Sequence, residues 1–220
     1  MTFPKPLRRI NDDRVVDLVI LFLALIGGIM FSLPLLLLTL FGYLSFRALG
    51  MTKPQNWNHF AVAAVLLTAI LFIASKTTLG PLASLVGEQI SSAQGLTDTI
   101  DFTDWKIYLL FLGVSVFTAG FLEEIVYRGY LLQRLAERLP LGLMSWPMAI
   151  LISNVSFSLW HAHGGADSMV FSFLMGVLIS LIFLITGRKL WLIIAAHSLY
   201  DVVVISLRFF QLDVPLPTVV

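Results

Sequence analysis

Two adjacent carboxylates and an arginine interrupt an apolar stretch of the sequence, "FLEEIVYRGY" at residues 121–130. In a helix, Glu124 and Arg128 would lie four residues apart on one face and could form an ion pair. Glu123 would be turned about 100° from Glu124 around the helix axis, so its carboxylate is free to point elsewhere. A carboxylate in this position can take a proton from water and act as a general base.

Two more groups repeat the four-residue spacing and add imidazoles. Phe157 and His161 lie four apart in "FSLWHAH", a spacing that continues an apolar face and points His161 inward. His197 and Asp201 share a face in "HSLYD", where the aspartate can accept a hydrogen bond from the imidazole and fix its tautomer. The structural alternative for these groups is a satisfied polar contact between neighbouring helices.

Two polar positions near His161 are weaker candidates. Asn154, with Ser153 and Ser156 beside it, is also explained as a helix–helix contact. His163 would be turned about 200° from His161 on a helix, so the two can share a site only if the helix has ended. Because "HGG" makes such an end plausible, we interpret His163 as a helix-end residue.

The composition places these groups in a membrane protein. Charged residues make up 12% of the chain, against about 25% in a soluble domain, and the mean hydropathy is +0.93. A charged side chain in the middle of a spanning helix costs about 2.5–3.5 kcal/mol, so such residues usually face the bundle interior and pair. The alternative for residues 123–128 is a helix end among lipid headgroups, where long side chains reach out of the bilayer.

The apolar runs predict an all-α fold, a polytopic transmembrane helical bundle with about six to seven spans. The predicted segments are Asp17–Phe46, Phe60–Ala74, Trp105–Pro140, Pro147–His161, Asp167–Thr186 and Leu190–Phe210. The polar stretch from about Lys76 to Lys106 is predicted as an extramembrane loop that can include a short surface helix. We divide the chain into N-terminal spans and loop (1–104), a catalytic membrane core of the C-terminal four helices (105–210) and a tail (211–220).

Basic residues predict the orientation of the bundle. The 134–146 connection and the 187–189 turn both carry Lys or Arg and are separated by two spans, so both are expected in the cytoplasm. The basic N-terminus, which we interpret as part of a retained membrane anchor, also favours the cytoplasm. This requires residues 17–46 to form a broken hairpin, whereas one long kinked span would place the N-terminus outside.

Charge and cysteine content exclude several classes of function. The net charge is +1, with no concentrated basic face, which argues against a nucleic-acid partner. The chain has no cysteine, so a cysteine nucleophile, a thiolate metal site and a disulfide framework are excluded.

Taken together, the three motifs resemble the CPBP family of CAAX proteases and bacteriocin-processing enzymes, also called Abi. The motifs are Glu-Glu-x-x-x-Arg at 123–128, Phe-x-x-x-His at 157–161 and His-x-x-x-Asn/Asp at 197–201. The resemblance covers residues 105–210 and implies an intramembrane endopeptidase of a bacterial cell membrane. Such an enzyme would act on a membrane-associated peptide or protein, as a CAAX-type or a leader- or bacteriocin-processing enzyme.

The resemblance also implies roles for the site residues. Glu123 would activate water with help from His161, while His197 and Asp201 would face the substrate carbonyl and stabilise the oxyanion. Where the family has Asn, an ionised Asp201 cannot donate, so it is either protonated or orients His197. The supporting residues are Glu124, Arg128, Phe157 and Asn154.

Alternative interpretations remain for the cofactor and for the class of function. Glu123, His161 and His197 could form a His₂Glu zinc site, but the sequence lacks His-Glu-x-x-His, and metal-free activation of water by glutamate is favoured. A proton-coupled transporter is the main rival, because buried Glu, His and Asp chains also relay protons. A non-catalytic membrane scaffold or immunity factor is the third possibility.

Overall fold

The protein is all-helical throughout the part described by its computed structural model, residues 14–40, 45–87 and 104–212. This confirms the predicted fold class. The predicted loop residues 88–103 and tail residues 213–220 lie outside the described residues. The α-helices are α1 (Arg14–Gly27), α2 (Ser32–Leu40), α3 (Trp57–Ala74), α4 (Gly80–Gly87), α5 (Trp105–Ser115), α6 (Gln133–Arg138), α7 (Ser145–Trp160), α8 (Gly165–Ile185) and α9 (Leu190–Phe209).

Five helical segments in the described ranges are long and apolar enough to cross a membrane. They are Trp57–Val86, Trp105–Arg138, Gly142–Trp160, Ala162–Ile185 and Leu190–Phe209. The last four coincide with the predicted C-terminal spans to within a few residues. A shorter apolar helix, Leu18–Gly27, accompanies them, so the bundle comes close to the six or seven spans expected.

The second span is longer than predicted, and the expectation that the polar loop starts at Lys76 is wrong. The helix continues from α3 through a π-helical turn, η2 (Ser75–Leu79), into α4. Ser75 donates to the carbonyl of Phe72 and Thr77 donates to that of Ile73. These hydroxyls are satisfied by the helix's own backbone, so the polar residues do not end it.

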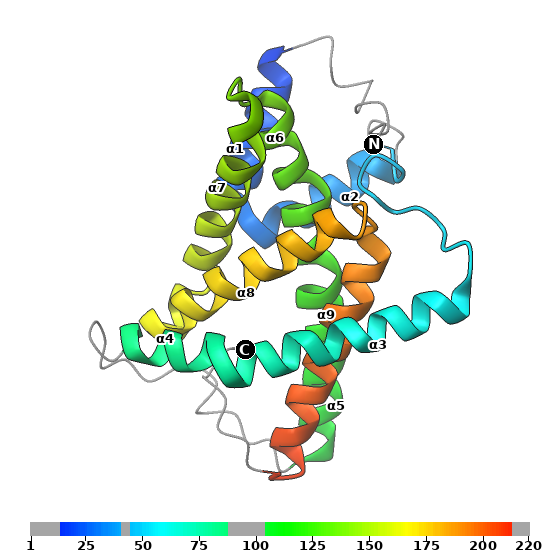
Figure 1. The fold of residues 1–220 in the computed structure, drawn as a ribbon, viewed down its shortest axis with the longest axis vertical. Coiled ribbons are helices and arrows are strands. Elements are labelled where there is room, and N and C mark those ends of the chain that lie inside the picture. Colours follow the sequence, from blue (N-terminus) through cyan, green and yellow to red (C-terminus); the bar gives the residue numbers. More distant parts are fainter. Residues whose placement is uncertain (1–13, 41–44, 88–103, 213–220) are drawn as a thin grey trace.

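The first apolar run is broken at Gly28, so it forms two short helices and not one long helix. Gly28 has a φ of +47°, a conformation that favours glycine, and a Cβ at this position would overlap the indole of Trp160. A 3₁₀ turn, η1 (Gly28–Phe31), follows and leads into α2. Figure 1 shows α1 running down beside α7, with α2 leaving its lower end and turning upward again.

The long helix that carries the first motif runs through the centre of the bundle (Figure 1). It begins with α5, changes to π-helical winding in η4 (Val116–Glu123) and η5 (Ile125–Leu132), and ends with α6. Extended π-helix is rare and is found mostly at functional sites. Every residue of η5 is buried, including Arg128, so the motif lies in the protein interior and not at an exposed helix end.

The remaining helices surround this central one and close the bundle. The N-terminal part is tied to the core by hydrogen bonds from Ser156 Oγ to the Leu25 carbonyl and from Thr68 Oγ1 to the Ala196 carbonyl. The backbone N–H of Leu190 donates to the carbonyl of Gly50. These contacts hold α1, α3 and the segment before α3 against the helices that carry the motifs.

Candidate active site

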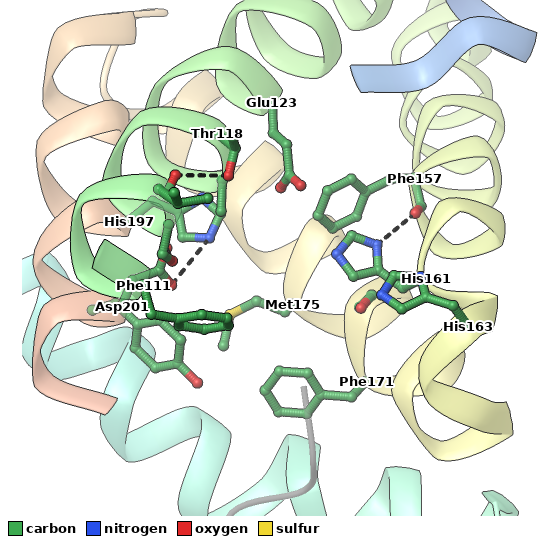
Figure 2. Close-up of a pocket in the computed structure, with 15 residues that line it drawn as sticks. Phe111, Thr118, Glu123, Phe157, His161, His163, Phe171, Met175, His197 and Asp201 are labelled. Atoms are coloured by element: carbon green, nitrogen blue, oxygen red, sulfur yellow. Dashed lines mark hydrogen bonds and ion pairs between the residues drawn. The ribbon is translucent and has the colours of Figure 1, made fainter. Parts of the chain in front are cut away.

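A pocket of about 210 Å³ lies between four segments of the bundle, and all three motifs open onto it. Figure 2 shows the carboxylate of Glu123 pointing into this space, with His197 and Asp201 on one side and Phe157 and His161 on the other. Four of these residues were predicted as catalytic and one as supporting. Tertiary structure therefore brings together side chains that are up to 78 positions apart (123 to 201) in the sequence.

Glu123 and Glu124 face different surroundings although they are neighbours. Glu123 ends η4, is 9% exposed and lines the pocket. Glu124 is fully buried behind it and forms the predicted ion pair with Arg128, with 3.3 Å between Oε1 and NH1. The divergence follows from the roughly quarter-turn that separates consecutive residues on a helix.

Arg128 is held on three sides. Besides Glu124, its guanidinium donates to the carbonyl of Gly176 at 3.1 Å and lies 4.9 Å from the ring centroid of Phe157. A buried guanidinium needs such partners because an uncompensated charge in the protein interior is strongly unfavourable. Arg128 does not line the pocket, so its contacts support an orienting role toward Glu124.

His197 forms a close contact with Glu124 that the sequence motifs did not predict. Its Nδ1 lies 2.6 Å from Glu124 Oε1, and both side chains are buried. Because an ionised carboxylate only accepts, Nδ1–H donates and the other ring nitrogen, Nε2, is left for the pocket. Glu124 thus bridges Arg128 and His197 through a single oxygen.

Asp201 does not form the hydrogen bond to His197 that its spacing predicted. The distance from His197 Nε2 to Asp201 Oδ1 is 3.8 Å, which permits an ion pair but exceeds a hydrogen bond. Asp201 instead accepts a hydrogen bond from Ser115 Oγ at 2.9 Å. The ring of His197 is therefore oriented by Glu124, while Asp201 adds a nearby negative charge.

His161 caps the end of α7, and its ring is fixed by the helix that it ends. Its Nδ1 lies 2.9 Å from the carbonyl of Phe157. A carbonyl only accepts, so Nδ1 carries the proton and Nε2 is an acceptor on a ring that lines the pocket. The helix does end here, which allows His163 to line the same pocket, with its own Nδ1 3.0 Å from the Trp160 carbonyl.

The two supporting residues on α7 lie behind this surface. Phe157 packs against His161, with 4.6 Å between ring centroids, and against Tyr127 at 4.9 Å. Asn154 is buried outside the pocket and donates to the carbonyl of Ile150 and to Ser180 Oγ. Asn154 thus makes the helix–helix contact that was its alternative interpretation.

Sequence reasoning missed several pocket residues that are not parts of a motif, among them Ser115 and Ser172. Ser115 holds Asp201, and Ser172 lines the pocket from α8. Serine is common in membrane helices, and the partner of Ser115 is 86 positions away, so the sequence offered no local spacing that marks either residue.

The predicted zinc ligands do not form a metal cluster in the described part of the chain. No group of three His, Asp or Glu side chains there is close enough to hold one ion. The Nδ1 atoms of His161 and His197 are engaged by Phe157 and Glu124, which leaves only Nε2 of each ring available. Zinc-binding histidines commonly donate their other ring N–H to a carbonyl or carboxylate in this way, so these contacts do not exclude a metal, and metal dependence stays a prediction.

A helical membrane bundle that holds carboxylates and imidazoles around one pocket has the groups that proton transfer or hydrolysis inside the bilayer requires. Residues 104–203 match the family model described as type II CAAX prenyl endopeptidase Rce1-like. The match includes all three motifs and confirms the resemblance drawn from them. No curated protein and no solved structure matched the chain. The match supports a CAAX-type intramembrane endopeptidase in general.

Proposed function

We propose that this protein is an intramembrane endopeptidase in which Glu123 activates the attacking water. The observation that carries the proposal is the position of the Glu123 carboxylate, which points into a pocket shared with His161 and His197 (Figure 2). Among the described residues the carboxylate of Glu123 forms no hydrogen bond or ion pair, whereas Glu124 contacts both Arg128 and His197. The first carboxylate is thus available to water and the second is structural.

The reaction begins with proton transfer from water to Glu123. The acceptor nitrogen of His161, Nε2, takes a hydrogen bond from the same water and holds it against the peptide carbonyl. Water oxygen then forms a bond to the carbonyl carbon, and the carbonyl oxygen becomes an oxyanion. Glu123 returns the proton to the leaving amine as the C–N bond breaks, which regenerates the carboxylate.

His197 stabilises the oxyanion through Nε2–H. Glu124 fixes the ring from the opposite side by accepting from Nδ1, and Asp201 lies close enough to favour a proton on Nε2 through its charge. Asp201 acts in this scheme as a charge beside the imidazole and not as the oxyanion donor.

The substrate class proposed is a membrane-associated peptide segment, either a prenylated CAAX tail or a leader- or bacteriocin-type precursor, in a bacterial cell membrane. The scheme uses no metal. If zinc were bound, it would supply Lewis-acid polarisation of the water or carbonyl. Metal analysis of the purified protein, together with cleavage before and after chelator treatment, tests this part of the proposal.

Substitution of Glu123 tests the function directly. We expect the purified wild type to cleave at least one of two internally quenched peptides, a farnesylated peptide with a C-a-a-X end or an unprenylated leader peptide. Glu123→Gln keeps the shape but cannot take a proton, so the cleavage rate should fall by at least about 10³-fold with unchanged thermal stability. Retention of cleavage in this variant would refute the proposed base.

The same variant separates the protease from its rivals. A proton-coupled transporter reconstituted in vesicles would show a pH-gradient-dependent flux that Glu123→Gln abolishes, with no peptide hydrolysis in the wild type. A scaffold would keep its biological effect in the variant.

A further inference from the structure

One of the pocket-lining residues on α8 has a buried hydroxyl with no partner among the described residues. Ser172 is 2% exposed and lines the pocket, yet its Oγ has no hydrogen bond within the described residues. A helical serine can bond back to a carbonyl of its own helix, as Ser180 does to Gly176 and Ser206 does to Val202. The hydroxyl of Ser172 does not take up this available alternative.

An unsatisfied buried hydroxyl is unfavourable, and such a group calls for an explanation. The wall that α8 contributes to the pocket consists of Phe171, Ser172 and Met175. Figure 2 shows Phe171 and Met175 on the side of the pocket that lies opposite Glu123. The hydroxyl is therefore the one polar side-chain group on the α8 wall of a pocket whose other walls carry the catalytic groups.

We propose that Ser172 hydrogen-bonds the backbone of the bound peptide and holds it across the pocket from Glu123. This inference rests on the proposed endopeptidase function and adds a substrate-binding residue to it. A peptide in a water-poor pocket must find partners for its N–H and C=O groups, since each one left unpaired weakens binding. Ser172 can donate to a carbonyl or accept from an N–H.

Replacement of Ser172 with alanine tests the inference by separating binding from stability. Using the peptide that the wild type cleaves, we expect Ser172→Ala to raise KM about tenfold, the effect of one neutral hydrogen bond, with kcat within about threefold. The free enzyme should be at least as stable to heat as the wild type, because the variant removes an unsatisfied hydroxyl. Ser172→Thr, which keeps the hydroxyl, should recover most of the affinity.

A partnered serine supplies the matched control. Ser158 is buried, donates to the carbonyl of Met169 and does not line the pocket. Ser158→Ala should lower thermal stability and leave KM within about twofold, the opposite pattern to Ser172→Ala. A Ser172→Ala variant that loses stability and keeps its KM would show that the hydroxyl is structural.

Binding to an inactive background keeps this inference separate from the proposed function. The fluorescent form of the same peptide is titrated into Glu123→Gln and into Glu123→Gln/Ser172→Ala. Equal affinities overturn the role of Ser172 and leave the protease standing. A tenfold difference without cleavage by the wild type supports Ser172 as a peptide contact and overturns the protease. Binding to neither variant overturns the inference.

Discussion

At the scale of single residues, the two adjacent glutamates have different functions because their partners differ. Glu124 is fully buried and shares one oxygen between Arg128 and His197. Glu123 points into the pocket, where water can reach it (Figure 2). Burial of an ion pair is tolerated only while both partners are present. Glu124 is therefore expected to dominate stability, and Glu123 to dominate catalysis.

Removal of Glu124 should destabilise the protein far more than removal of the neighbouring charge. Glu124→Ala leaves Arg128 as an uncompensated buried charge, which we expect to cost about 3–5 kcal/mol of unfolding free energy. Unfolding in mixed detergent micelles measures this cost, and Glu123→Gln serves as the control with little loss.

A double variant checks the origin of that cost. Adding Arg128→Met to Glu124→Ala removes the unpaired guanidinium and should recover part of the lost stability. If Glu124→Ala proves as stable as Glu123→Gln, the ion pair has no structural importance.

At the scale of elements, the central helix and α9 must approach closely for the site to form. Gly120 lies in η4, three residues before Glu123, and a Cβ there would be 2.0 Å from Ser198 Oγ and 3.0 Å from Ser198 Cα. Ser198 follows His197 directly in α9. The missing side chain of Gly120 thus allows the contact that brings Glu124 within hydrogen-bonding distance of His197.

Alanine at Gly120 should separate the two helices and disable the site. We expect Gly120→Ala to lower the cleavage rate at least about tenfold and to destabilise the fold by about 1–3 kcal/mol, because the clash includes backbone atoms. Activity and thermal unfolding of the purified variant measure both effects.

Gly113 provides a control on the same central helix. A Cβ at Gly113 would meet nothing within 4 Å, so Gly113→Ala should be neutral or slightly stabilising through helix propensity. Equal behaviour of Gly113→Ala and Gly120→Ala would contradict the close-approach argument.

At the scale of the whole molecule, the α6–α7 connection and the α8–α9 turn have basic residues in or next to them, and both lie toward one end of the bundle. In Figure 1 the α6–α7 connection lies at the top and the α8–α9 turn at the upper right, while α5 begins and α9 ends at the bottom. Arg138 precedes the first connection, and Arg188 and Lys189 lie in the turn. The rule for cytoplasmic loops favours this end inside the cell.

The break at Gly28 fits the same orientation. With α1 and α2 as a broken hairpin, α1 begins on the side of the basic connections and α2 turns back toward that side (Figure 1). One uninterrupted span would place the two ends of this segment on opposite sides of the bilayer.

Single cysteines test the orientation cleanly because the native chain has none. Leu143 lies in the α6–α7 connection and Leu212 follows α9, and both are exposed. We expect a membrane-impermeant maleimide to label Leu212→Cys on intact expressing cells and Leu143→Cys only after the membrane is opened. The reverse pattern would invert the bundle and refute the orientation.

The sequence by itself determined the class of fold, the positions of the C-terminal spans and the motif residues that line the pocket. The thickness of the bilayer sets the length of each apolar run, and charged residues are too costly to bury in it without a function. Both features are local properties of the sequence. The pairing of Glu124 with Arg128 was likewise predictable, because four-residue spacing fixes it within one helix.

Only the tertiary structure decided which groups on different helices meet. In the structure, His197 is hydrogen-bonded to Glu124 and not to Asp201, and Asp201 accepts a hydrogen bond from Ser115. Ser172 lines the pocket. The second span also extends past Lys76, where hydroxyls bond to their own helix. Contacts between helices depend on how the helices are rotated and how far apart they lie. Packing at positions such as Gly120 sets both quantities, and residue spacing along one helix does not encode them.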